Sequence, residues 1–173
     1  HHQDVVIEIG GSQLAGHLTI PSQPNGLVVF AHGSGSSHHS PRNRFVASVL
    51  NRSGLATLLF DLLTQSEEVD RANVFDVDLP AARLAEATGY IRRFSGLQGL
   101  PVGYFGASTG AAAALRAAAV PNADVGAVVS RGGRPDLAGD TLATVRAPTL
   151  LIVGGADAQV LLLNQQAQAH LKC

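Results

Sequence analysis

One five-residue segment, Gly106-Ala107-Ser108-Thr109-Gly110, constrains the fold of this chain more than any other feature. It follows a short apolar run, Val102–Phe105, that is typical of a buried strand. It leads into an alanine-rich run, Ala111–Arg116, that is typical of a helix. A tight turn between a strand and a helix leaves little room for side chains, which explains the flanking glycines. Ser108 at the centre must then tolerate a strained backbone.

The same segment predicts a nucleophile. Gly-x-Ser-x-Gly between a strand and a helix is the pattern of the nucleophile elbow, which holds a serine hydroxyl above the end of a sheet. We therefore interpret Ser108 as a candidate nucleophile. The alternative is a serine in a purely structural turn. The short pattern also arises by chance, so the flanking strand and helix carry much of its weight.

Strand-like and helical runs alternate along the rest of the chain, which predicts an α/β fold with a mostly parallel, doubly wound sheet. The first two expected strands flank Gly10–Ser12 and predict an antiparallel hairpin at the edge of the sheet. The expected strands are Val5–Ile9, Leu14–Ile20, Gly26–Ala31, Ala56–Asp61, Val102–Phe105, Gly126–Ser130 and Thr149–Val153. No repeat or linker divides the chain, so residues 1–173 are expected to form a single domain.

The helices are predicted from caps and apolar periodicity. One is expected over Pro41–Asn51, with Ser40 as its cap and an apolar stripe of Phe45, Val46, Val49 and Leu50. Another carries Leu84, Ala87, Ile91 and Phe94 on one face, and the last covers Val160–Leu171. The polar stretch Thr64–Phe75 is longer than a routine connection and is a candidate for shaping a pocket. Arg131–Pro148 is expected to be irregular.

Composition excludes several classes of function. Hydrophobic residues make up 46% of the chain and charged residues 14%, which indicates a globular protein. A formal net charge of −1 gives no electrostatic reason to expect nucleic acid or a membrane surface as a partner. We expect a cytoplasmic protein, because Cys173 is the only cysteine and no apolar run resembles a signal peptide or membrane span. His1–His2 fits the remnant of a purification tag.

In a parallel sheet, functional groups gather in the loops at the carboxyl ends of the strands. The elbow is one such loop, and the glycine-rich His32–Ser37 and the segment Gly154–Asp157 are two others. An attacking serine needs donors that stabilise the oxyanion. The Thr109 N–H is one natural donor, and the Ser34 N–H, which small neighbours leave accessible, is the other. Asp157 is placed to hold a histidine, although a helix N-cap is a strong alternative.

Three segments, each at a strand end, resemble those of α/β-hydrolases, most closely the dienelactone-hydrolase-like branch. They are Phe30–Ser37, Gly103–Gly110 and Val153–Asp157, and the resemblance extends from Gly26 onward. It implies Ser108 as nucleophile, Asp157 as triad acid, and Gly33–Ser34 with Thr109 as the oxyanion hole. We expect no cofactor, and no metal, because His38 and His39 do not pair with other ligands at metal-site spacing. Dienelactone hydrolases proper use cysteine where this chain has Ser108. The resemblance therefore implies a broader serine esterase that acts on a small ester or lactone.

The histidine of the triad has no obvious place in the chain. In the family it follows one more strand after the acid. Here His170 is the only histidine after Asp157, and a helix would carry it on the order of 20 Å away. We expect the histidine, with a final strand and helix, beyond Cys173, so the 173 residues alone should be catalytically incomplete. A sheet edge left open in this way would raise the risk of self-association, so a homo-oligomer is one alternative and the oligomeric state stays open.

Other polar residues carry open alternatives. His38 and His39 are interpreted mainly as exposed loop residues, with a catalytic role at Ser108 as the alternative. Asp61 is interpreted as a pocket wall or a loop cap. Arg131 could bind a substrate carboxylate or form an ion pair, for which the candidate partners are Asp136, Asp140 and Asp157. Two rival functions also remain, a non-catalytic binding module on the hydrolase scaffold and a peptidase or acyltransferase.

Overall fold

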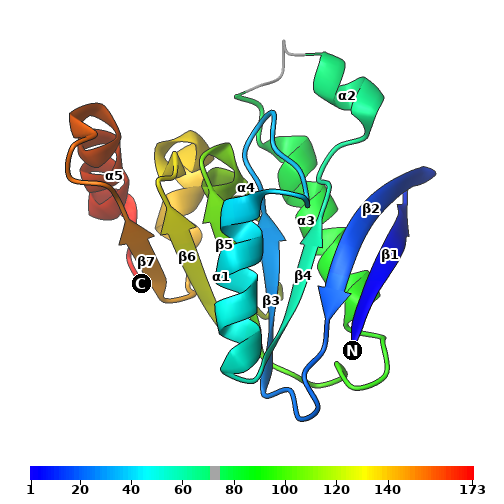
Figure 1. Ribbon diagram of the computed structural model, residues 1–173. Helices are drawn as coiled ribbons and strands as arrows, with labels where there is room; N and C mark the ends of the chain where they lie inside the picture. Colours follow the sequence, from blue (N-terminus) through cyan, green and yellow to red (C-terminus); the bar gives the residue numbers. More distant parts are fainter. Residues whose placement is uncertain (71–74) are drawn as a thin grey trace.

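The computed structural model describes residues 1–70 and 75–173. Within these residues, seven strands form one sheet in the order β1-β2-β4-β3-β5-β6-β7 (Figure 1). The strands are β1 (His2–Ile9), β2 (Ser12–Thr19), β3 (Gly26–Ala31), β4 (Leu55–Phe60), β5 (Val102–Ala107), β6 (Ala127–Arg131) and β7 (Thr149–Ile152). Strands β3 to β7 run parallel to one another, whereas β2 pairs antiparallel with both β1 and β4. The predicted α/β class and the hairpin at one edge are confirmed.

Helices cover both faces of the sheet (Figure 1). Helix α1 lies in front of the central strands, and α3 and α4 lie behind them. The helices are α1 (Pro41–Arg52), α2 (Gln65–Val69), α3 (Asp78–Ile91), α4 (Thr109–Ala118), the 3-10 segment η2 (Pro135–Thr144) and α5 (Ala158–His170). The connection from β6 to β7, expected to be irregular, therefore contains the 3-10 segment, which is kinked at Gly139.

The main core lies between the sheet and helices α3 and α4. Ala111 to Leu115 of α4 are completely buried, and so are Leu84, Ala87 and Ile91 of α3. The predicted inward face is thus confirmed for these three residues of α3, whereas Phe94 lies beyond the end of the helix and is partly buried. Alanine lets α4 approach the sheet closely, because its side chain adds almost no thickness to the helix.

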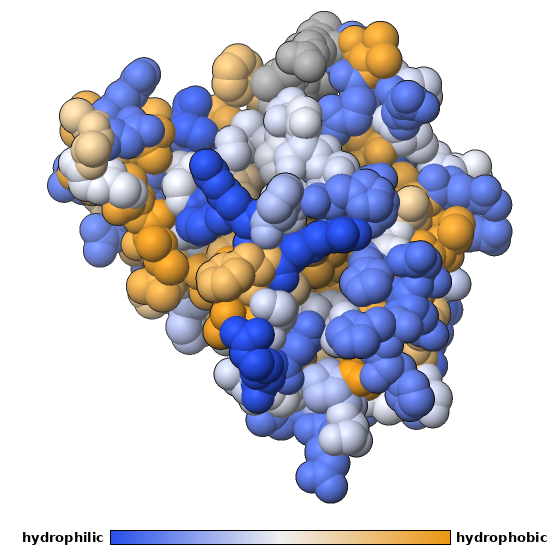
Figure 2. Space-filling model, viewed as in Figure 1, coloured by the Kyte–Doolittle hydropathy of each residue, from blue (hydrophilic) through white to orange (hydrophobic). Residues whose placement is uncertain are grey.

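The predicted apolar stripe of α1 matches its buried face only in part, because only Val46 and Leu50 of the stripe pack against the sheet. Phe45 is 69% exposed and Val49 is 39% exposed, whereas Asn43 and Ala47 are buried. A small buried cluster, Phe30, Ala47, Leu59 and Phe105, fills the space between α1 and the sheet. Helix α1 therefore presents its small residues, Asn43 and Ala47, to the strands. Figure 2 shows hydrophobic surface beside this helix.

The part of the chain that the structure describes contains no helix of the length and hydropathy needed to cross a bilayer.

The packing of α4 gives a stability prediction. Leu115 is completely buried, so Leu115→Ala should lower the free energy of unfolding by about 2–5 kcal/mol through lost burial and a new cavity. Leu162 of α5 is 53% exposed, and Leu162→Ala should change it by less than about 0.5 kcal/mol. Urea denaturation of both variants tests this, and equal losses would contradict the assignment of α4 to the core.

Candidate active site

Ser108 occupies the junction between β5 and α4 with φ 54° and ψ −130°. Asn122 and Asp124 are the other non-glycine residues with positive φ in the described part of the chain. A non-glycine residue in such a region carries a conformational cost of order 1–3 kcal/mol. The side chain is exposed at the end of β5. The strained turn predicted for Ser108 is therefore present, and it presents the hydroxyl to solvent.

Three glycines allow this turn to form. A Cβ at Gly106 would lie 2.7 Å from the Ala111 backbone nitrogen, and one at Gly110 would collide with the Ala31 carbonyl. A Cβ at Gly33 would lie 2.8 Å from the Ser108 Cβ. At these three positions there is thus no room for a side chain, because the ends of β3 and β5 lie against the start of α4. This contact brings the glycine-rich loop against Ser108.

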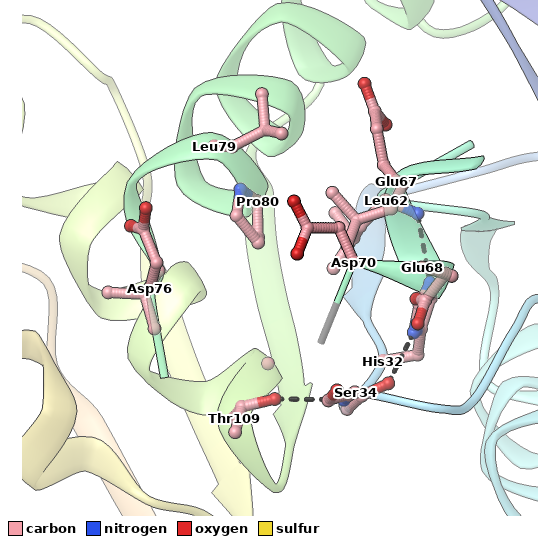
Figure 3. A pocket seen from close by; sticks show the side chains of 14 residues that line it. His32, Ser34, Leu62, Glu67, Glu68, Asp70, Asp76, Leu79, Pro80 and Thr109 are labelled. Carbon is pink, nitrogen blue, oxygen red and sulfur yellow. Dashed lines mark hydrogen bonds between the residues drawn. The ribbon is translucent and has the colours of Figure 1, made fainter. Parts of the chain in front are cut away.

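The two residues that carry the predicted oxyanion donors are in contact. The Ser34 N–H donates to Thr109 Oγ1 across 3.0 Å (Figure 3). Ser34 and Thr109 are separated by 75 positions in the chain, so this bond joins the loop after β3 to the first residue of α4. The Ser34 N–H was expected to be accessible. Instead it is occupied by the hydroxyl of its predicted partner.

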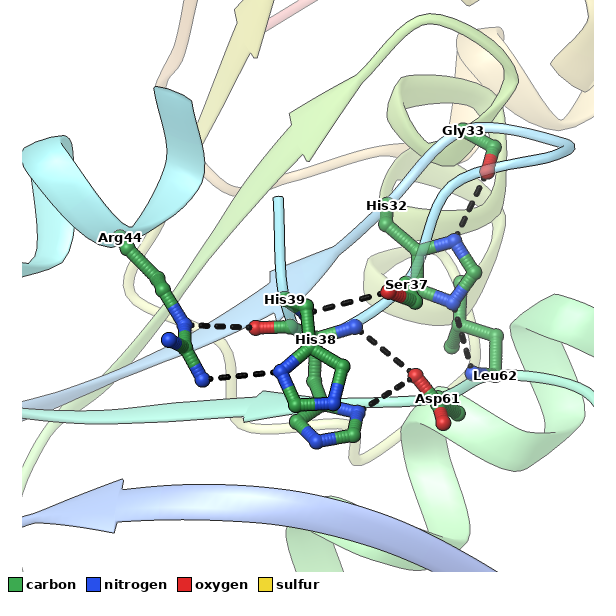
Figure 4. Close-up of polar contacts among 8 residues, drawn as sticks. All are labelled: His32, Gly33, Ser37, His38, His39, Arg44, Asp61 and Leu62. Carbon is green, nitrogen blue, oxygen red and sulfur yellow. Dashed lines mark hydrogen bonds and ion pairs between the residues drawn. The ribbon is translucent and has the colours of Figure 1, made fainter. Parts of the chain in front are cut away.

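The role of His32 was not predicted from the sequence. The residue is buried, with its Nδ1 2.8 Å from the Gly33 carbonyl oxygen and its Nε2 2.9 Å from the Leu62 nitrogen (Figure 4). His32 thereby ties the glycine-rich loop to the end of β4. The sequence signal that could have indicated this role is the position of His32, directly between an apolar strand and a glycine.

Asp157 follows β7 and caps α5, with Oδ1 accepting from the Val160 N–H at 3.1 Å. All seven histidines lie in the described residues, and none of them hydrogen-bonds to Ser108 Oγ or to Asp157. His170 is the last residue of α5, at the opposite end of that helix from Asp157. The described residues therefore contain the candidate nucleophile and the predicted donors, without a histidine bonded to either triad candidate.

A cavity of about 190 Å³ adjoins the residues of the predicted oxyanion donors (Figure 3). Gly33, Ser34, Thr109 and Gly110 form one wall. The rest of the lining is apolar from Leu62, Leu63, Val77, Leu79 and Pro80, and acidic from Glu67, Glu68, Asp70 and Asp76. Much of this second wall comes from the stretch Thr64–Phe75 and the residues that follow it. That stretch was predicted to shape a pocket, and its residues 71–74 lie outside the described part.

An ion pair fixes the wall that α2 contributes. Arg83 of α3 donates to both carboxylate oxygens of Glu67, at 2.7 and 3.0 Å. Arg83 is 8% exposed. Its hydrogen bonds hold the pKa of Glu67 below the ordinary value, against the opposing effect of burial. The bidentate pair attaches α2 to α3 above the cavity.

The ion pair considered for Arg131 is not formed. Arg131 pairs with none of its three candidate carboxylates, all of which lie in the described residues, and donates instead to Asn43 Oδ1 at 2.9 Å. Arg134 binds Asp136 in its place, which raises the pKa of Arg134. Burial, followed by nearby Arg42, lowers the pKa of Arg131.

His38 is also more enclosed than expected. Its side chain is 11% exposed, and its ring Nδ1 and backbone N–H both lie 2.8 Å from Asp61 Oδ1 (Figure 4). Asp61 therefore caps the loop, which was one of the two roles predicted for it.

The tight junction gives a matched pair of substitutions. Gly110→Ala should lower the free energy of unfolding by about 3 kcal/mol or more, because the new methyl group meets the Ala31 backbone. Gly89 lies in α3 with open space around it, so Gly89→Ala should stabilise by about 0.5–1 kcal/mol. Thermal and denaturant unfolding of the two variants measure the contrast. A Gly110→Ala protein as stable as the wild type would contradict the close approach.

The Glu67–Arg83 pair gives a pH prediction. The pKa of Glu67 is lowered in the fold, so its stabilisation is complete above the ordinary value of 4.5 and is lost as the pH falls through the lowered value. Glu67→Gln should cost about 1 kcal/mol at pH 7, since the pair is partly exposed, and progressively less below pH 4.5. Denaturant unfolding across this pH range measures the difference. Glu68→Gln is the control, because Glu68 forms no ion pair in the described residues. A constant difference between the Glu67→Gln variant and the wild type at all pH values would contradict the prediction.

No protein-family model matches the chain. Two proteins from Mycobacterium tuberculosis, strains CDC 1551 and H37Rv, are 64% identical to it over 173 residues, which is 99% of this chain. Both carry the provisional name phosphoribosyl transferase, and the chain spans 39% of their length.

Two solved structures match the chain over most of their own length. The dienelactone hydrolase of Anabaena variabilis is 53% identical, with a TM-score of 0.92 over 99% of this chain and 82% of that chain. Est1E of Butyrivibrio proteoclasticus shares the fold at 14% identity, with a TM-score of 0.82 over 98% of this chain and 85% of that chain.

Proposed function

Because the chain belongs to the α/β-hydrolase family, we propose that it is a serine hydrolase acting on small esters or lactones. The observation that carries the proposal is the exposed, strained Ser108, held against Gly33 at the end of β5. The Anabaena dienelactone hydrolase, at 53% identity, supports a hydrolytic reaction. Purely structural turns have no need for a hydroxyl in this position.

The proposed reaction begins with attack of Ser108 Oγ on the substrate carbonyl. The proton passes to a histidine from outside these 173 residues, which Asp157 orients, and then to the leaving alcohol. The N–H groups of Ser34 and Thr109 hold the oxyanion. In the free protein the Ser34 N–H binds Thr109 Oγ1, so the substrate oxygen takes the place of that hydroxyl. Water then hydrolyses the ester formed on Ser108.

The cavity supports a small substrate. Its volume of about 190 Å³ lies below the roughly 300–1,000 Å³ of pockets for drug-sized ligands. Its apolar wall, which includes Leu62, Val77 and Leu79, suits a short acyl or alcohol group. The Anabaena protein is named for a dienelactone substrate. For this chain, the serine at position 108 favours the broader class of esterases.

The name of the mycobacterial relatives describes polypeptides of which this chain spans 39%. We propose that the part matched by this chain carries the hydrolase reaction. The name does not identify which part of those polypeptides carries a transferase reaction.

The test uses the full-length natural polypeptide that contains these residues, with p-nitrophenyl acetate and a fluorophosphonate probe. We expect Ser108→Ala to abolish labelling and to lower kcat by at least about 10³-fold, because the nucleophile is lost. Asp157→Asn should lower kcat by about 10³–10⁴-fold while leaving Ser108 in place. Ser36→Ala, in the same loop, is the control and should retain activity.

Two outcomes would reject the proposal. One is a wild-type protein that neither labels at Ser108 nor loses turnover in Ser108→Ala. The other is tight binding of a small ligand that Ser108→Ala leaves unchanged, which would favour a non-catalytic binding module.

A further inference from the structure

The contacts of His32 define its tautomer. Nε2 lies 2.9 Å from the Leu62 nitrogen, and because a backbone N–H only donates, Nε2 accepts. Nδ1 lies 2.8 Å from the Gly33 carbonyl oxygen, which only accepts, so Nδ1 carries the proton. His32 is 5% exposed, and both ring nitrogens have partners (Figure 4). His32 is therefore a neutral, fixed link between the end of β4 and the glycine-rich loop.

This link controls a peptide group that the proposed reaction uses. The Gly33 carbonyl and the Ser34 N–H belong to one planar trans peptide, so the two bonds point in opposite directions. Holding the carbonyl toward the His32 ring directs the N–H away from it. The Ser34 N–H indeed reaches Thr109 Oγ1, at 3.0 Å, on the other side.

A second bond to the same carbonyl does not replace this link. The Ser36 N–H also donates to the Gly33 oxygen, at 3.1 Å, but that bond closes a turn within the loop. It would move with the loop if the loop rotated as a unit. His32 directly follows Ala31, the last residue of β3, so its ring holds the carbonyl from the body of the sheet.

We infer that His32 is a positioning residue that sets the direction of the Ser34 oxyanion N–H through the Gly33 carbonyl. The inference rests on the proposed function for the reaction that this N–H serves. His32 does not touch the substrate or exchange a proton in this role. It acts by keeping one donor aligned before the substrate arrives, which avoids reorganisation in the transition state.

Two substitutions separate the two bonds of the ring. In His32→Asn the amide nitrogen stands close to the position of Nδ1, so the bond to the Gly33 carbonyl is retained and the Leu62 N–H loses its acceptor. In His32→Gln the amide oxygen reaches the position of Nε2, so the Leu62 bond is retained and the carbonyl loses the ring donor. The carbonyl still has Ser36 in that variant, whereas the Leu62 N–H in the Asn variant is left without the acceptor that the ring supplied.

The two roles therefore predict opposite orders. If His32 only stabilises the loop, the Asn variant is the more damaged of the two in both stability and kcat. If His32 positions the donor, the Gln variant loses kcat by about 10²-fold with KM nearly unchanged, while the Asn variant stays within a few-fold of the wild type. The measurements are kcat, KM and the urea midpoint of the full-length polypeptide, with p-nitrophenyl acetate as substrate.

A spectroscopic readout tests the inference apart from activity. The amide proton resonance of Ser34 reports its bond to Thr109, and it should shift in the Gln variant and stay in place in the Asn variant. Equal shifts in both variants, or a kcat that follows the urea midpoint, would overturn the positioning role. If the wild type shows no Ser108-dependent turnover, the proposed function fails, and the Ser34 resonance alone then decides on His32.

Discussion

The close approach of α4 to the ends of β3 and β5 is the constraint on which the site depends. It requires glycine at positions 106 and 110, because a Cβ at either would meet backbone atoms of a neighbouring segment. It also requires the thin, alanine-rich face of α4, which is completely buried. With the helix this close, its first residue, Thr109, reaches the loop after β3, and Ser108 is forced into its strained conformation. Packing in the core thus determines the geometry of the polar groups above it.

This constraint explains why much of the fold could be predicted. Strands, helices and the elbow follow from local patterns, in which glycine, alanine and apolar periodicity act on neighbouring residues. The capping of α1 by Ser40 and the inward face of α3 are of this kind. Ser108, Gly33, Ser34 and Thr109 came together because the carboxyl ends of neighbouring parallel strands share one edge of the sheet.

The polar contacts at that edge could not be predicted in the same way. They join segments far apart in the chain, and the sequence offers each side chain several partners. Arg131 had three candidate carboxylates and bonds instead to Asn43, 88 positions away. His38 and Asp61 form a pair across 23 positions of the chain, and the local sequence around neither residue predicts it. Only part of the predicted stripe of α1 packs against the sheet, because periodicity reveals an apolar face but not how deeply each of its residues is buried.

These contacts show which parts of the site form without the catalytic base. Three features of the site are present without a histidine bonded to Ser108. They are the strain at Ser108, the bond from Ser34 to Thr109 and the bond from His32 to the Gly33 carbonyl. The donor side of the proposed reaction is therefore built by the sheet and α4, independently of the base. The strain lies in the backbone, and an alanine at position 108 would experience it through the same Cβ. Removing the Ser108 hydroxyl therefore leaves the turn and its donors in place, and any loss of activity that results reports on chemistry and not on folding.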